Sequence, residues 1–224
     1  MIGFRIAALS LLSFFVAWPA RADKEINCVV VMQYTPDLAG SEDQAKNEDL
    51  LKSADVVAAK LGDAVIEKVT SDRKLQKALD AFTSGKRCCK TITILSHGLG
   101  DGALLMPYDL PKSSTGAPIE SGKENRLGGS VGKTAWGKEQ LDAFTKSIKK
   151  ASCTKQPSVT LDGCWTAAEG GIAEQLSERG VATSGFTGSC DFGYSEDEKT
   201  HKKEYHGPEP KKGADSEEKS FKAK

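Results

Sequence analysis

Residues 26–34 read INCVVVMQY, an almost unbroken apolar run that decides the class of fold. Polar and apolar positions do not alternate in it, which is typical of a strand buried on both faces of a parallel sheet. Shorter apolar clusters rich in β-branched residues predict further strands at 64–69, 91–96, 158–161 and 181–186. A strand buried on both faces needs a covering layer on each side.

The segments between these strands supply the covering layers. Apolar residues recur there at three- and four-residue spacing, which predicts amphipathic helices at 42–61, 71–82, 136–150 and 167–179. Strands that alternate with helices predict an α/β three-layer sandwich with a mainly parallel sheet. In such sheets the functional site forms at the carboxyl ends of the strands.

The N-terminal 22 residues have the pattern of a cleavable signal peptide. Arg5 precedes an apolar run at 6–18, and Ala20-Arg21-Ala22 supplies a small-x-small cleavage site. The run is shorter than the roughly 20 apolar residues that span a bilayer, so no stable membrane insertion is expected after cleavage. The sequence therefore predicts a protein exported to the periplasm or the medium, with a mature chain that begins at Asp23.

The mature chain divides into a domain at 23–194 and a charged segment at 195–224. The second segment has few apolar residues and is predicted to be a disordered tail, through which a partner protein could bind. The whole chain has 31 basic and 31 acidic residues, so its zero net charge gives no general attraction to nucleic acid or anionic lipid. It carries no nucleic-acid-binding motif.

Two reactive side chains follow predicted strands directly. His97 follows the strand at 91–96, and Cys164 follows the strand at 158–161. If these strands are neighbours, both side chains face one crevice at the carboxyl edge of the sheet. A thiolate is a nucleophile, and a nearby imidazole promotes it and protonates the leaving group. The N–H groups of Gly98 and Cys164 could then form an oxyanion hole.

These residues carry a resemblance to a known family. One predicted strand ends in Leu95-Ser96-His97-Gly98, and another ends in Leu161-Asp162-Gly163-Cys164. The histidine and the cysteine are 67 residues apart (164 minus 97). This arrangement resembles the caspase-like cysteine peptidases. That superfamily includes caspases, legumains, gingipains and clostripain. The block LDGCWTAA at 161–168 is similar to the cysteine block of its bacterial members. The resemblance covers roughly residues 26–186.

The resemblance implies a sheet in the order 2-1-3-4, to which the fifth predicted strand is added. It implies that His97 is the proton donor, Cys164 the nucleophile and Gly98 an oxyanion donor. The substrate would be a peptide or protein, and the family needs no cofactor. The spacer is longer than in compact caspases, and Gly163 stands where alanine is common. Asp162 and Asp191 are the candidates for binding the substrate side chain beside the scissile bond.

Six cysteines in an exported chain predict disulfides. With the strand order implied by the family, four of them lie at the amino-end pole of the sheet, where Cys28 would bond Cys88 or Cys89 and Cys153 would bond the other. Cys164 and Cys190 remain at the opposite pole. They are either a free nucleophile with a spare thiol, or a third bridge that silences the nucleophile or makes it a redox switch.

Other motifs give weaker predictions. Residues 128–132 (GGSVG) match the Gly-x-Ser-x-Gly elbow of α/β-hydrolases, but the residues before them are too polar for the strand this motif needs. No cysteine or histidine spacing predicts a metal site. Residues 98–135 are rich in glycine and polar residues and form a long loop that would shape or cover the crevice. Trp165 is expected in the core or a pocket wall.

Two functional hypotheses follow. The first is an exported cysteine hydrolase, a peptidase with a His97–Cys164 dyad. The second is a catalytically inactive binding or structural module of the same fold, in which three disulfides close all six cysteines. The number of free thiols separates them, because only the enzyme needs one.

Overall fold

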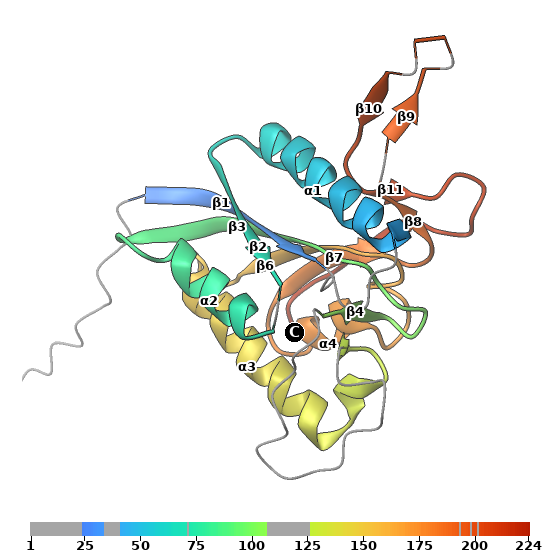
Figure 1. The fold of residues 1–224 in the computed structure, drawn as a ribbon. Coiled ribbons are helices and arrows are strands. Elements are labelled where there is room, and N and C mark those ends of the chain that lie inside the picture. The colour runs from blue at the N-terminus through green and yellow to red at the C-terminus, as the bar shows by residue number, and fades with distance from the viewer. Residues whose placement is uncertain are drawn as a thin grey trace, which may run out of the picture.

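The structure is a computed structural model that describes residues 24–33, 41–70, 72–106, 126–192, 194–197, 199–200 and 202–224. The predicted signal peptide at 1–22 lies outside the described residues. The described residues build one central sheet with helices packed on both of its faces (Figure 1).

Six strands form the central sheet in the order β12-β7-β6-β3-β1-β2. Five of them run parallel, and β12 pairs antiparallel with β7 at the edge. Their bounds are β1 (Lys24–Met32), β2 (Ala64–Val69), β3 (Arg87–Leu95), β6 (Ser158–Asp162), β7 (Ala182–Phe186) and β12 (Glu218–Phe221). The predicted α/β class, the mainly parallel sheet and the order of the five predicted strands are confirmed.

The two faces of the sheet carry separate cores. The apolar face of α1 (Ser41–Leu61) packs on one side, where Leu50 and Ala54 are buried with Val29, Val31 and Leu95. The other three helices cover the opposite side and bury the larger core (Figure 1). They are α2 (Asp72–Phe82), α3 (Ala135–Ala151) and α4 (Ile172–Ser177). Val29 and Val30 point to opposite cores, as a strand buried on both faces requires.

The described parts of the predicted long loop at 98–135, residues 98–106 and 126–135, contain regular structure, and residues 107–125 lie outside the described residues. The loop contains β4 (Ala103–Leu105) and β5 (Arg126–Gly128), which pair antiparallel, and the short helix η2 (Val131–Lys133). Leu104 and Leu127 from these strands are buried in the larger core. Few apolar residues are needed here, because the two strands satisfy each other's backbone groups.

The structure differs from the prediction of a disordered tail. Beyond β8 (Cys190–Asp191), the chain forms β9 (Tyr194–Glu196), β10 (Lys203–Tyr205), β11 (Glu209–Pro210) and finally β12. The β9–β10 hairpin projects from the body in Figure 1, whereas β12 extends the central sheet.

Backbone hydrogen bonds hold the end of the chain in place, which composition does not reveal. Phe221 is the single apolar anchor of β12 and packs against the larger core. Ser177 Oγ donates to Lys222 O at 2.9 Å, and Lys224 N donates to Ser177 O at 3.0 Å. An edge strand gains most of its stability from ladder hydrogen bonds, so a charged sequence can still form one.

Four cysteines form two disulfides at the amino-end pole of the sheet. Cys28 bonds Cys89 with a Cα–Cα distance of 5.6 Å, and Cys88 bonds Cys153 with a Cα–Cα distance of 4.9 Å. Cys153 N also donates to Cys89 O at 2.9 Å, which joins the end of α3 to the start of β3. The expected disulfides at this pole are therefore present, and the pairing left open by the sequence is resolved.

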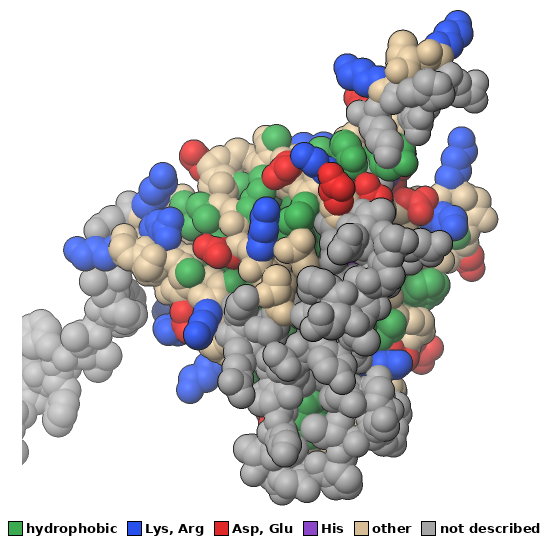
Figure 2. All heavy atoms as spheres, viewed as in Figure 1, with side chains coloured by type: hydrophobic (Ala, Val, Ile, Leu, Met, Phe, Trp, Pro, Cys, Tyr) green, Lys and Arg blue, Asp and Glu red, His purple; other side chains and the backbone are tan. Residues whose placement is uncertain are grey.

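Basic and acidic side chains are interspersed on the face of the molecule seen in Figure 2, rather than gathered by sign. This distribution agrees with the zero net charge of the sequence. Among the described residues, no helix has the length and hydropathy needed to cross a bilayer.

Candidate functional site

The register of β3 against β6 brings His97 and Cys164 to the same rim of the sheet. Leu95 is paired with Asp162, and Ser96 N donates to Asp162 O at 3.1 Å. His97 and Cys164 each lie two residues beyond this cross-strand pair. Parallel strands end at a common edge, so both residues emerge at the carboxyl edge, where sites form in such sheets.

Beyond the strands, the two loops touch through their backbones. Gly98 packs against the carbonyl group of Cys164 so closely that a Cβ on Gly98 would overlap that oxygen. Neither Gly98 N–H nor Cys164 N–H donates to a backbone carbonyl in the described part of the chain. The two predicted oxyanion donors are therefore adjacent, and the ladder of the sheet does not use them.

The imidazole of His97 lies half-buried against an aromatic ring. Its ring centroid is 5.9 Å from that of Phe192, in an edge-on arrangement, and its Nε2 atom is buried. The main chain of His97 is fixed as well, because its carbonyl accepts a hydrogen bond of 2.8 Å from Leu105 N. The β4 strand thus holds the histidine at the end of β3.

Cys164 is joined to Cys190 in a third disulfide, with a Cα–Cα distance of 4.9 Å. Cys190 N lies 2.9 Å from Cys164 Sγ, so the first residue of β8 contacts this sulfur atom. None of the six cysteines in the described chain is free. The form of the protein described here therefore has no thiol nucleophile, and the alternative left open by the sequence is resolved in favour of a bridge.

A buried carboxyl group lies two residues before the sulfur. Asp162 is only 9% exposed, and its burial, together with the negative charge of Glu218 on β12, raises its pKa to about 7. Asp191, the other predicted candidate for substrate binding, is exposed on β8 beside Cys190. The two aspartates thus differ in environment, although both lie close in sequence to the bridge.

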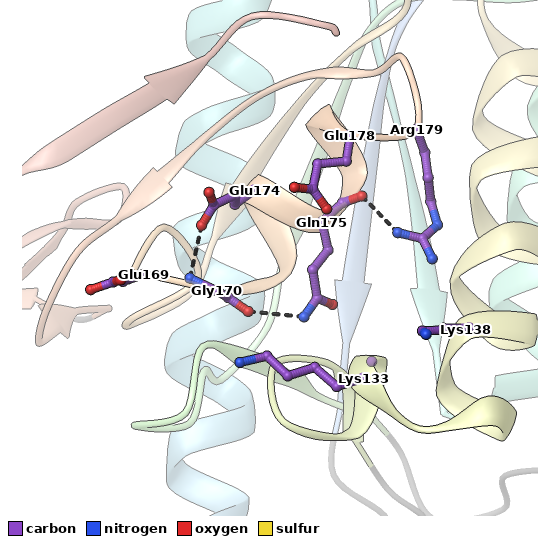
Figure 3. Close-up of a pocket in the computed structure, with 9 residues that line it drawn as sticks. Lys133, Lys138, Glu169, Gly170, Glu174, Gln175, Glu178 and Arg179 are labelled. Atoms are coloured by element: carbon purple, nitrogen blue, oxygen red, sulfur yellow. Dashed lines mark hydrogen bonds between the residues drawn. The ribbon is translucent and has the colours of Figure 1, made fainter.

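The loop after Cys164 is braced by α4 (Figure 3). Glu174 Oε2 accepts from Gly170 N at 2.8 Å, and Gln175 Nε2 donates to Gly170 O and Gly129 O. Gly170, Glu174 and Gln175 line a hollow of about 610 Å³ that also presents Lys133 and Lys138. The two bonds to Gly170 hold the end of this loop that lies next to α4.

Ser130, the serine of the Gly-x-Ser-x-Gly match, has a structural partner. Its hydroxyl and its N–H both donate to Asp101 Oδ2, and Arg126 lies 3.4 Å from the same atom. Burial raises the pKa of Asp101, but the hydrogen bonds from Ser130 and Ala103 outweigh it, and the pKa lies below the usual value. This ionised carboxylate joins the paired strands β4 and β5 to the segment that follows them, and the Ser130 hydroxyl is used in that contact.

Sequence reasoning missed Phe192 as part of the rim. It lies between β8 and β9 in a charged stretch with no apolar periodicity. Only its position in the sequence, two residues after Cys190, could have indicated that it lies at the rim. Within the described residues, no three His, Cys, Asp or Glu side chains gather in a way that could hold a metal ion.

Comparison of the sequence with protein-family models and with curated proteins finds no match. Three disulfides in one domain are typical of proteins outside the reducing cytosol.

Proposed function

We propose that this chain is an exported cysteine hydrolase, a peptidase of the caspase-like kind, whose nucleophile Cys164 is stored as a disulfide with Cys190. The observation that carries the proposal is the shared rim of β3 and β6. There His97 and Cys164 each follow the Leu95–Asp162 pair by two residues. Residues 1–22 would direct export and be removed.

The surroundings of the rim support this chemistry. Two adjacent N–H groups, those of Gly98 and Cys164, are left out of the sheet ladder and are suited to bind the oxyanion of a tetrahedral intermediate. Cys164 is half-buried and its partner Cys190 is 8% exposed, whereas Cys28 and Cys89 at the other pole are 0% and 1% exposed. Accessible disulfides are the ones that exchange with external thiols.

Activation requires a dithiol reductant. One thiolate of the reductant attacks Cys164 Sγ, which is the more accessible sulfur, the Cys164–Cys190 bond breaks, and the electron pair leaves with Cys190 as a thiolate. The second thiol of the reductant then displaces Cys164, which leaves the reductant as a disulfide and the protein with two reduced cysteines. The exchange transfers two electrons and two protons, so it balances without a further reactant.

Hydrolysis would then proceed in two steps. The Cys164 thiolate attacks the peptide carbonyl carbon, and the C–N bond breaks as His97 gives a proton to the leaving amine. Water next attacks the thioester, loses a proton to His97 and releases the carboxylic acid and the thiolate. The half-buried ring of His97, packed on Phe192, is held at the rim for both transfers.

The test compares two single variants. Cys190→Ala leaves Cys164 without its partner and is expected to hydrolyse a mixed fluorogenic peptide library with no reductant. Wild type is expected to need a dithiol, and Cys164→Ala to stay inactive in both conditions. Loss of activity in Cys190→Ala, with correct folding shown by circular dichroism, would contradict the proposal.

A second function is favoured by one specific observation, the closure of all six cysteines. In that case the chain would be a disulfide-stabilised binding or structural module, and its charged C-terminal segment or the β4–β5 hairpin would contact a partner. Cys190→Ala would then lose stability and gain no hydrolysis. Reduction of the Cys164–Cys190 bridge would weaken partner binding instead of starting catalysis.

A further inference from the structure

Trp165, the residue after Cys164, has a backbone conformation that side chains avoid. Its φ angle is 58°, in the left-handed region, where a bulky residue is an outlier. Hydrogen bonds on both sides fix it there, because Trp165 N donates to Gly188 O and Trp165 O accepts from Ala168 N, each at 2.9 Å. Glycine would adopt this conformation without strain.

Packing of the indole in the hydrophobic core does not explain why tryptophan, and not glycine, occupies this position. Trp165 is half-buried and belongs to neither core cluster of the described residues, whereas Trp136 is 3% exposed. The chain therefore accepts strain at the residue beside the sulfur to keep a large aromatic side chain partly in solvent. Strained residues of this kind cluster at active sites and ligand clamps.

The neighbourhood favours an apolar ligand group over a charged one. Phe192 places a second aromatic ring at the same rim, against His97, although aromatic residues make up only 7% of the chain. The nearest buried acid, Asp162, has its pKa raised to about 7 by burial and then by Glu218, so it carries little charge at pH 6. A basic substrate side chain would find no fixed buried charge there.

We infer that Trp165 is a specificity-determining residue that selects peptides with a large apolar, preferably aromatic, side chain beside the scissile bond. The inference rests on the proposed hydrolase function. Contact between two aromatic rings adds about 0.5–1.5 kcal/mol beyond the area buried, which corresponds to about 2- to 13-fold in affinity.

Binding to a variant that cannot react tests the inference. The Cys164→Ala/Cys190→Ala double variant would be titrated at pH 6 with acetylated Ala-Ala-X-Ala-Ala amides, where X is Phe, Arg or Ala, and followed by calorimetry. The Phe peptide is expected to bind about tenfold more tightly than the Ala peptide. Added Trp165→Gly should abolish this ratio, and added Trp165→Phe should keep most of it.

Melting temperatures distinguish a role of Trp165 in peptide binding from a role in the stability of the fold. Glycine relieves the left-handed strain that alanine keeps, and this gain exceeds the extra entropy that glycine gives the unfolded chain. Trp165→Gly is therefore expected to melt about 2–4 °C above Trp165→Ala, while both lose the preference for Phe. A ratio that survives Trp165→Gly, a preference for the Arg peptide, or no peptide binding at all would overturn the inference.

The outcome also distinguishes this inference from the function it rests on. Trp165-dependent binding without hydrolysis by reduced wild type would remove the hydrolase and leave a peptide-binding site. Hydrolysis with the same Phe-to-Ala ratio of kcat/KM in wild type and Trp165→Gly would keep the hydrolase and remove the role of Trp165.

Discussion

Gly98 packs on the main-chain carbonyl of Cys164, and this contact ties the loop after β3 to the loop after β6. The two loops carry the imidazole and the sulfur, so their spacing sets the geometry of the whole rim. No side chain fits between them, which explains why a glycine follows His97 directly.

Gly98→Ala is expected to disturb this contact. The added Cβ would overlap backbone atoms of Cys164, which cannot yield as a flexible side chain can. We expect a loss of about 1–3 kcal/mol in the free energy of unfolding, measured by urea titration, and loss of peptide hydrolysis after reduction. Gly100→Ala is the matched control, because nothing lies within 4 Å of a Cβ at Gly100. Equal stability of the two variants would argue against the contact.

The disulfide in the core should be the last of the three to be reduced. Cys28 and Cys89 are 0% and 1% exposed, whereas Cys164 and Cys153 are half-buried and their partners Cys190 and Cys88 are 8% and 9% exposed. Because exchange requires access to sulfur, a graded dithiol titration with alkylation and mass spectrometry should label Cys28 and Cys89 after the other four cysteines. Labelling of Cys28 and Cys89 before Cys164 and Cys190 would be inconsistent with a reducible bridge at the site.

The amino-end bridge between Cys88 and Cys153 has a structural role. It closes a span of 65 residues, so the Cys88→Ala/Cys153→Ala variant should lose roughly 4 kcal/mol of unfolding free energy. Hydrolysis by the folded, reduced protein should persist, since this pole is opposite the rim. A variant that keeps full stability in urea would show that the bridge adds nothing to the fold.

Asp162 should make stability fall as pH rises. The unfolded chain loses this proton near pH 3.8, whereas burial, and then Glu218, raise the folded pKa to about 7. Between these values the folded state binds more protons than the unfolded chain. The stabilisation of the folded state by this proton is therefore complete below pH 3.8 and is lost by about pH 7. Asp162→Asn removes this titration and should be more stable than wild type at pH 8 by on the order of 4 kcal/mol.

The check is the urea midpoint of both proteins from pH 3.5 to pH 8. The difference between them should grow through that window and then level off. Glu218→Gln should move the wild-type transition to lower pH, because it removes the second cause of the raised pKa. Parallel pH profiles for wild type and Asp162→Asn would show that Asp162 ionises normally in the fold.

Strand β12 should contribute to stability despite its charged sequence. A chain that ends after Ser216 loses β12 and exposes the edge of β7, so it should melt about 4–8 °C lower and self-associate. A chain that ends after Lys222 keeps the strand and the bond from Ser177, and serves as the control. Equal melting temperatures for the two truncations would contradict this role.

The sequence predicts the five parallel strands because their apolar runs must be buried on two faces, and no other layer arrangement buries them. It also predicts the rim, since His97 and Cys164 follow strands that become neighbours. It does not predict β12, whose pairing depends on backbone groups that every sequence possesses. It left the state of Cys164 open as well, because only the path of the chain to Cys190 decides whether the two sulfurs meet.

The positions of Phe192 and Trp165 in the structure could not be predicted from the sequence either. A single aromatic residue in a polar stretch has no periodicity, so nothing in composition separates a ring at the rim from one in solvent. The left-handed φ of Trp165 is equally invisible, because it follows from hydrogen bonds made by residues on other elements.

The most direct measurement follows one wild-type sample through a dithiol titration. The fraction of Cys164 in the thiol form, from alkylation and mass spectrometry, is compared at each point with the rate of peptide hydrolysis. We expect the rate to rise in proportion to reduced Cys164 and to be absent in Cys164→Ala. Complete reduction of Cys164 with no hydrolysis of any peptide in the mixed library would contradict this expectation.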